Sequence, residues 1–373
     1  MERQRSVQMR PVREVSWPPP RRSGSRRLPI VLVLLLLVLA GGYTAWWLHA
    51  ATRFRDGTLD WIENRRAEGW RLAYADVSRV GFPLQLGLRF AKPVVGTPAG
   101  DWTWAVSGAL LSTDVFDHRP LRLAVEGEQT LELGGARSAG GERHAYSGIA
   151  DEFIVDLVPG GWMPNGHLRV RHLAVAGNSA GDEFGIGRLD LVSRGDPAAA
   201  PRPESSSYAM ELTVDDFGLP ESAGVPLCRE VAHLAFDAKL LGPLKPGPWP
   251  AALAAWREAG GVVEATRLVL VCGPLTQNGE GTFALDTSGQ PIGATSMRIQ
   301  GYEAALDRLV ADRAIAAHTA ATAKILLRSL ARSGGEGAPT LTAPLSIQDR
   351  TLSVGPVPLL RLPLLHWLNG AAR

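Results

Sequence analysis

The sequence lacks most of the features that indicate an enzyme or a metal-binding module. It contains only two cysteines and four lysines among 373 residues. Two cysteines exclude a disulfide-framework mini-protein and a four-cysteine zinc module. No H-E-x-x-H motif, phosphate-binding loop or dinucleotide-binding glycine pattern occurs. We therefore expect no catalytic, cofactor or metal site, and we expect that the protein is not an enzyme.

The net charge changes sign after the first 27 residues. This tail holds eight arginines and two glutamates, whereas the remaining 31 basic and 35 acidic residues give the rest of the chain a net charge of −4. A large, mildly negative body is poorly suited to binding a polyanion, which excludes nucleic acid as the main partner. The chain is 45% hydrophobic, so most of it can bury enough surface to fold.

One long apolar segment follows the basic tail. Leu28 to Leu48 contains 21 residues and no charged side chain, which as a helix spans about one hydrocarbon thickness of roughly 30 Å. Trp46 and Trp47 lie at its C-terminal end, where interfacial aromatic residues are common. The arginines before it place tail 1–27 in the cytoplasm by the positive-inside rule. We predict a single-pass anchor at 28–48 in the bacterial inner membrane and an exported, periplasmic domain at 49–373.

Other interpretations of this apolar segment remain open. Val38 and Ala40 permit cleavage of a signal peptide after Ala40, although the apolar run continues beyond that position. Arg26 and Arg27 resemble part of a twin-arginine signal, but Pro29 and the missing polar run argue against it. A buried core helix would usually be shorter and less uniformly apolar.

From Trp70 onward, apolar and polar residues alternate with the period of half-buried antiparallel strands. The clearest runs are 121–126, 168–171, 189–191, 210–215 and 233–240. They are short and bounded by Gly, Pro, Asn and Asp, which indicates a meander. No rhythm of alternating strands and helices indicates a doubly wound sheet. The predicted fold class is mainly β (α+β): an N-terminal transmembrane helix followed by an exported antiparallel β-rich body with a few covering helices.

Helical patterns cover residues 51–68, 250–259 and 302–332, the last with a break indicated at 318–322. The first of these helices is either a stalk beside the membrane or a cover for the sheet. The low-complexity stretch 194–207 is either a linker or a long loop, and the similar strand pattern on both sides favours the loop. The apolar tail 357–368 is too short to span a membrane and contains two prolines, so we predict that it packs on the sheet.

Ser179 is the one candidate nucleophile that a motif suggests. Gly177-Asn178-Ser179-Ala180-Gly181 matches G-x-S-x-G, the motif of α/β-hydrolases. That chemistry needs a helix directly after the serine, whereas the residues after Gly181 alternate as in a strand. We therefore interpret Ser179 as part of a hairpin loop, and a membrane-tethered serine hydrolase remains the least favoured function.

Three further groups of residues have structural interpretations. His167 and His172 are five residues apart on a predicted strand and therefore face opposite sides, unsuited to sharing a metal. Asp215-Asp216 would suggest paired carboxylates, but a turn before Phe217 is the preferred interpretation. Core packing or interfacial anchoring accounts better than a carbohydrate or lipid surface for eight of the tryptophans, Trp46, Trp47, Trp61, Trp70, Trp102, Trp104, Trp249 and Trp256.

Cys228 and Cys272 are predicted to form a disulfide. An exported domain lies in an oxidising compartment, where thiols that meet should pair. Cys228 precedes the predicted strand 231–240, and Cys272 ends the predicted strand 265–271. If these strands pair antiparallel, the start of the first lies beside the end of the second, within reach of a bridge. The alternative is two buried thiols that act as small apolar residues.

The order of several short motifs is similar to that of an uncharacterised bacterial family of membrane-anchored proteins, domain-of-unknown-function family 2125. The matching residues are Gly69-Trp70, Gly81-Phe82-Pro83, Trp102, Trp104, Trp256, Gly260-Gly261, Gly273-Pro274-Leu275, Gly279-Glu280-Gly281, Asp286 to Gly293, Gly301-Tyr302 and Leu352 to Pro358. The resemblance implies an anchored envelope protein without an assigned activity, and it transfers no catalytic residues. The layout also loosely resembles AsmA-type envelope proteins, in which one N-terminal helix precedes a β-rich, lipid-handling body.

The sequence therefore favours a non-catalytic, membrane-anchored envelope protein that binds or passes lipid along a curved sheet. The same features fit a scaffold or assembly factor that binds another envelope protein. Bound acyl chains would distinguish the first function, a co-purifying protein partner the second, and labelling of Ser179 by a serine-directed probe the hydrolase.

Overall fold

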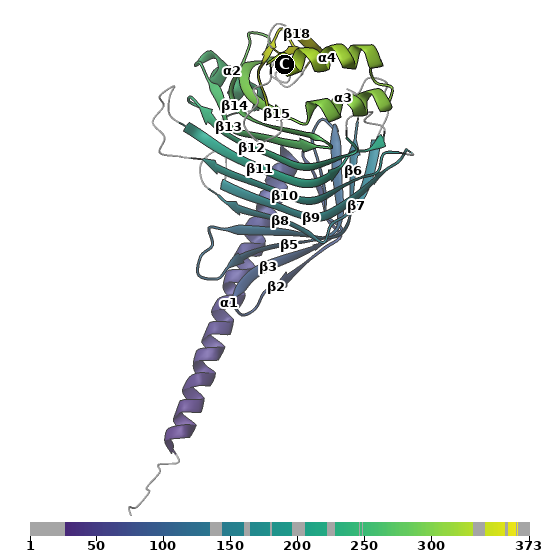
Figure 1. Ribbon diagram of the computed structural model, residues 1–373. Coiled ribbons are helices and arrows are strands. Elements are labelled where there is room, and N and C mark those ends of the chain that lie inside the picture. Colours follow the sequence, from purple (N-terminus) through teal and green to yellow (C-terminus); the bar gives the residue numbers. More distant parts are fainter. Residues whose placement is uncertain are drawn as a thin grey trace, which may run out of the picture. The chain divides into compact units, whose positions relative to one another are not determined.

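The computed structural model describes residues 27–134, 144–159, 165–179, 181–195, 206–221, 228–245, 247, 249–330, 340–354, 357–362 and 364 (Figure 1). The chain separates into two compact units, with the boundary between His49 and Ala50. The first unit is the apolar helical segment, and the second contains every strand. Each unit is described by itself.

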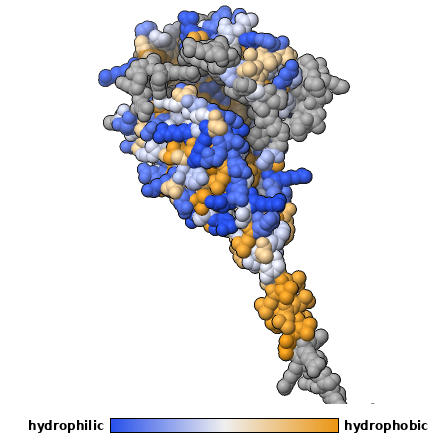
Figure 2. Space-filling view, turned by 180° about the vertical axis from the view of Figure 1, so that it is seen from behind, coloured by the Kyte–Doolittle hydropathy of each residue, from blue (hydrophilic) through white to orange (hydrophobic). Residues whose placement is uncertain are grey.

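Helix α1 (Arg27–Ala67) begins with the predicted anchor and continues without interruption to the end of the predicted covering helix. Its apolar side chains from Ile30 to Leu39 are 54–70% exposed. Among the described residues, Ile30–Ala67 is the one helix long and apolar enough to cross a membrane, and Figure 2 shows its apolar part as a continuous hydrophobic surface. The prediction of a helix that could serve as a single-pass anchor is confirmed.

The second part of α1 covers the first strands of the sheet. Ile62 is 7% exposed and belongs to a cluster with Leu88 and Phe90, against which Phe54 and Leu59 pack. The helix ends where Gly69, with φ of +91°, donates a hydrogen bond to the carbonyl of Arg66, as expected of a glycine after a helix. Within the second unit, residues 51–67 are therefore a cover of the sheet.

The second unit is built on one large antiparallel sheet (Figure 1). The predicted mainly β (α+β) fold is confirmed. Its strands are β1 (Arg71–Ala73), β2 (Asp76–Val80), β3 (Gln85–Ala91), β4 (Val94–Gly96), β5 (Trp102–Asp114), β6 (Leu121–Leu133), β7 (His144–Ile149), β8 (Glu152–Val158), β9 (Asn165–Gly177), β10 (Phe184–Gly195), β11 (Ser206–Gly218), β12 (Glu230–Leu241), β13 (Val262–Cys272), β14 (Leu275–Leu285), β15 (Pro291–Gln300), β16 (Leu341–Gln348), β17 (Thr351–Val354) and β18 (Val357–Arg361).

The connectivity is a meander, in which each strand from β9 to β18 pairs with the next. Two positions in the sheet are each shared by two short strands. Strands β7 and β8 both pair with β6 and β9, and strands β3 and β4 both pair with β5. The low-complexity stretch joins β10 and β11, which pair directly; its residues 196–205 lie outside the described part of the chain.

Three helices accompany the later strands. Helix α2 (Trp249–Glu258) follows β12, and its Trp256 is 1% exposed and donates from Nε1 to the carbonyl of Leu241 at 2.8 Å. Gly261 has no room for a side chain, because a Cβ there would lie 2.2 Å from the Trp256 ring. Helices α3 (Tyr302–Ala311) and α4 (Ala317–Leu330) contact β14 and β16, with Tyr302 in a cluster with Leu341 and Ala343.

Two local predictions are wrong. The break between the last two helices falls at 312–316, with Arg313 at φ of +58°, and not at 318–322. Asp215 and Asp216 lie inside β11, where Asp216 has φ of +53°, and not in a turn.

Part of the apolar C-terminal tail forms β18, which pairs with β17 in antiparallel register, for example Leu352 with Leu360. This arrangement agrees with packing of the tail on its own sheet. Residues 365–373 lie outside the described residues.

Candidate functional site

One face of the sheet carries a continuous apolar row across twelve strands. Residues that pair directly in antiparallel strands share a face, so the row can be followed from pair to pair. In spatial order, from β3 to β16, it is Leu88, Leu111, Leu123, Val155, Leu168, Leu191, Leu212, Phe236, Leu268, Gly279, Met297 and Ala343. We call the face that holds this row the apolar face.

A second row runs parallel to the first on the apolar face. Its members, from β8 to β16, are Phe153, Val170, Leu189, Val214, Leu234, Leu270, Gln277, Ile299 and Leu341. A hollow of about 280 Å³, whose lining includes Leu234, Phe236, Leu268 and Leu345, lies along the later part of the same face. Eight of the nine members of the second row are apolar, Gln277 being the exception, so the apolar character extends beyond the first row.

Burial along the first row is high at its two ends and lower in the middle. Leu88 is 0% exposed near α1, and Met297 and Ala343 are 7% and 5% exposed near α3 and α4. From Leu111 to Leu268 every member is only half-buried. Among the described elements, helices cover the ends of the apolar face and leave its middle accessible. An uncovered apolar surface of this extent marks a site of interaction.

A kink in β9 to β11 brings a further group of side chains onto the apolar face. His172 and Asp216 have φ of +46° and +53°, and Leu173 and Val175 follow the kink. They line the same cavity as Phe153, the pairing partner of Val170. The spacing from Val170 to Leu173 is three residues, so the kink has shifted the alternation of the side chains by one position, while the pairing register of β9 with β10 is the same on both sides of it.

The cavity beside this kink has a volume of about 780 Å³ and aromatic walls. Its aromatic residues come from β5 (Trp102 and Trp104), β7 (Tyr146), β8 (Phe153) and β10 (Phe184), and Leu131 and Leu133 of β6 add aliphatic surface. The rings contact in pairs, Trp104 with Phe153 at 5.8 Å and Tyr146 with Phe184 at 6.2 Å between centroids. We call it the aromatic cavity.

Two polar side chains also line the aromatic cavity. Gln129 of β6 is 8% exposed, and Asp182 lies in the turn before β10. Neither side chain has a hydrogen bond or ion pair with another residue in the part of the chain that the structure describes. These two groups are therefore available to a ligand.

The opposite face of the sheet is charged. Asp190 accepts hydrogen bonds from Arg188 at 2.5 Å and His167 at 3.2 Å and lies 3.1 Å from Arg171. Burial alone would raise the pKa of this carboxyl, but the hydrogen bonds from Arg188, Arg171 and His167 outweigh it and lower the pKa to about 2.

Asp156 forms a second centre on the charged face. It accepts from Arg122 at 2.7 Å and from Arg169 at 2.9 Å. Burial opposes ionisation of this carboxyl, but its pKa is lowered overall by the two arginines. The two faces thus differ in kind: ion pairs hold neighbouring strands together on one, and apolar side chains lie half-exposed on the other.

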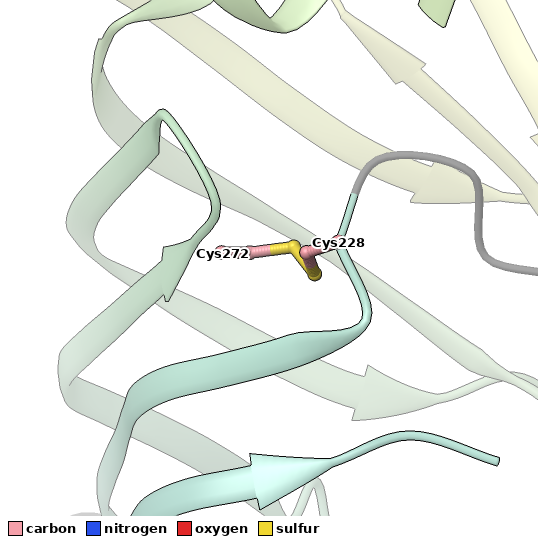
Figure 3. The surroundings of a disulfide bond; sticks show 2 residues. All are labelled: Cys228 and Cys272. Carbon is pink, nitrogen blue, oxygen red and sulfur yellow. A yellow bond between two sulfur atoms is a disulfide. The ribbon is translucent and has the colours of Figure 1, made fainter. Parts of the chain in front are cut away.

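Cys228 and Cys272 are joined in a disulfide, with Cα atoms 5.5 Å apart (Figure 3). Cys228 lies just before β12, and Cys272 ends β13 and pairs with Val231 in the antiparallel register. The bridge packs against Phe217, Leu219, Leu234 and Leu270. The disulfide joins the start of β12 to the end of β13, near the aromatic cavity, and its role is structural.

Ser179 lies in the connection between the antiparallel strands β9 and β10 and is exposed. Asp182 donates its backbone N–H to the carbonyl of Ser179 at 3.2 Å. Since a strand follows and not a helix, the strand–turn–helix arrangement of a hydrolase nucleophile is not formed here. His167 is hydrogen-bonded to Asp190 and His172 to Asp151, so the two histidines have different partners. Within the described ranges, no three metal-ligating side chains come together.

The aromatic cavity combines residues that the sequence alone does not connect. The sequence offered Trp102 and Trp104 as candidates for a lipid surface. No motif marks the other residues of the cavity, which include Tyr146, Phe153, Phe184, Gln129 and Asp182. These residues come from distant parts of the sequence, and only the order of strands β5 to β10 brings them together. Trp256 of α2 is buried, in agreement with core packing, whereas Trp61 is 55% exposed.

Together these features define a class of protein: an apolar N-terminal helix joined to a single large antiparallel sheet with one apolar and one charged face. The chain belongs to the family described as "uncharacterized protein conserved in bacteria (DUF2125)", whose model matches residues 47–363. The resemblance inferred from the motifs is thereby confirmed. No curated protein and no solved structure matches the chain.

Proposed function

We propose that the protein is a non-catalytic, single-pass protein of the bacterial cell envelope that binds lipid acyl chains along the apolar face of its sheet. The N-terminal tail lies in the cytoplasm, the helix from residue 28 to 48 spans the inner membrane, and the sheet is periplasmic. No cofactor takes part in this function.

The observation that carries the proposal is the first apolar row, which crosses twelve strands without a charged member. Its central residues, from Leu111 to Leu268, are half-buried and have no covering element among the described residues. An acyl chain that lies across the strands would bury these side chains and gain roughly 25 cal/mol for each Å² of apolar surface removed from water. The membrane supplies such chains in the immediate surroundings.

The charge distribution supports the proposed membrane orientation, with the N-terminal tail in the cytoplasm. Eight arginines precede the apolar segment, whereas the rest of the chain is mildly acidic, and basic residues are retained on the cytoplasmic side. The disulfide fits an oxidising compartment. The hairpin position of Ser179 supports a function without a serine nucleophile.

The proposal is tested by lipid mass spectrometry on the full-length protein extracted from membranes. We expect bound acyl lipids in the wild type and a several-fold loss in Leu191→Asn, which places a polar group in the middle of the first row. The matched control is Val192→Asn. Val192 is the next residue on β10 and pairs with His167 and Glu211 on the charged face, so this variant should keep the lipid.

Equal lipid content in both variants at equal thermal stability would overturn the proposal. So would a wild-type protein that carries no lipid and instead retains a defined protein partner, because that result would identify a scaffold or assembly factor.

A further inference from the structure

The aromatic cavity differs in chemistry from the rest of the apolar face. The rows are mainly aliphatic, whereas five aromatic rings from four strands surround the cavity. Aromatic faces carry negative partial charge and attract cations, most of all when water is excluded. Aliphatic side chains offer no such attraction. The change from aliphatic to aromatic lining therefore indicates a different part of the same ligand.

The polar groups of the cavity point to the same chemistry. The carboxylate of Asp182 lines the cavity and has no ion pair in the described chain. Gln129 is 8% exposed as a residue, and its side-chain amide has no hydrogen bond with another described residue. A carboxylate beside aromatic rings suits a cation, and an amide N–H suits an oxygen acceptor close to it.

Among the described residues, no lysine or arginine lines the aromatic cavity. A second hollow of about 760 Å³ shares Gly148, Val175 and Phe184 with it and is lined by Glu128 and Glu183, and its described lining likewise holds no basic residue. Neither glutamate forms an ion pair with another described residue. The charged side chains that a purely anionic head group would meet in the described lining are therefore all acidic.

We propose that the aromatic cavity binds the head group of a lipid that carries an ammonium group, while the acyl chains lie along the apolar face. This inference rests on the proposed function and adds the class of lipid. The ammonium group lies against the aromatic rings and the carboxylate of Asp182, and Gln129 donates to an oxygen of the phosphate. The cavity selects zwitterionic phospholipids over anionic ones.

The inference is tested by photocrosslinking in vesicles of defined composition. Full-length protein with benzoylphenylalanine at position 133, where Leu133 lines the cavity and is 39% exposed, is reconstituted into equal parts of phosphatidylethanolamine, phosphatidylcholine and phosphatidylglycerol with identical acyl chains. Mass spectrometry of the adducts identifies each head group. We expect the ammonium lipids to exceed phosphatidylglycerol about tenfold, the ratio that about 1.4 kcal/mol of differential binding gives.

Asp182→Asn should reduce this excess towards equal labelling, and its circular dichroism and thermal midpoint establish that it folds. The matched control is Glu183→Gln, which removes the neighbouring carboxylate from the second hollow and should keep the excess. Labelling of all three lipids in equal amounts by the wild type would overturn the head-group inference and leave acyl binding intact. An excess that survives in Asp182→Asn would overturn the role of this carboxylate. Absence of any lipid adduct would overturn the proposed function itself.

Discussion

Asp190 neutralises two arginines that stand opposite each other on neighbouring strands. Arg171 of β9 and Arg188 of β10 are direct pairing partners, and like charges in that relation destabilise a sheet. The Asp190 side chain is 14% exposed and contacts both guanidinium groups. This carboxylate therefore turns a repulsive pair into a stabilising cluster.

We expect Asp190→Asn to lower the free energy of unfolding by about 1–2 kcal/mol near pH 7, less than the full pKa shift implies because Arg188 is 53% exposed. The folded-state pKa of Asp190 is lowered to about 2, so its contribution is complete above about pH 4 and disappears as the pH falls towards 2. Urea unfolding between pH 2 and pH 7 measures this dependence. Asp76→Asn, at an exposed position of β2, is the control, and an equal loss in both variants would contradict the role of Asp190.

The disulfide closes a loop of 44 residues between Cys228 and Cys272. In the chain-entropy model, a loop of this size contributes about 4 kcal/mol, less any strain. We expect the double variant Cys228→Ala/Cys272→Ala to lose about 2–4 kcal/mol of unfolding free energy. Peptide mapping without reductant, on protein taken from the envelope, should recover the bridged peptide. Two free, alkylatable thiols would contradict the bridge.

The cysteine pair could be predicted because it depends on two strands that are close in sequence and on one assumption about their direction. The aromatic cavity could not be predicted from the sequence. Trp102, Phe153 and Phe184 come together only when the order of six strands is known, and a kink at His172 shifts the alternation that would otherwise orient Leu173. Asp182 and Gln129 are residue types that usually lie on a protein surface, and only their place in the cavity lining, without a partner among the described residues, distinguishes them.

At the scale of elements, the alternation of apolar and polar residues predicted the meander well, whereas the helical patterns predicted the helix boundaries less well. The break between α3 and α4 was misplaced because residues 303–330 contain neither glycine nor proline, so no residue with a strong conformational preference indicates where the helix stops. The real break is made by Arg313 in a left-handed conformation. The anchor and the helix after it form one element because no helix-breaking residue separates Leu48 from Ala51.

Strand β18 forms the pairing partner of β17 at one end of the meander. We expect truncation before Val357 to lower the thermal midpoint of unfolding, because it removes this partner and exposes the backbone groups of β17. The control is a shorter truncation that removes residues 365–373 and keeps β18. Unchanged stability of the longer truncation, together with loss of lipid or of a partner, would show that the tail serves docking and not self-packing.

At the scale of the whole molecule, the proposed topology places a single crossing between a basic tail and an acidic domain. We expect alkaline phosphatase fused after residue 373 to be active, because the fusion enzyme needs an oxidising compartment to fold. A fluorescent cytoplasmic reporter at the same position should be dark. An inactive phosphatase with a bright reporter would reverse the orientation, and release of the domain from membranes with cleavage after Ala40 would replace the anchor with a signal peptide.

The meander has a consequence for how this chain reaches its folded state. Because each strand from β9 to β18 pairs with its immediate successor, every pairing in that series joins strands that are neighbours in the chain. Loop closure therefore costs little entropy for most of these pairs, and the longest connection, from β15 to β16, contains the helices α3 and α4. In the proposed topology the N-terminal tail stays in the cytoplasm and the exported domain crosses the membrane beginning at residue 49, so each strand can add to an existing edge as it emerges. Assembly can therefore follow translocation strand by strand, with the growing edge as its template.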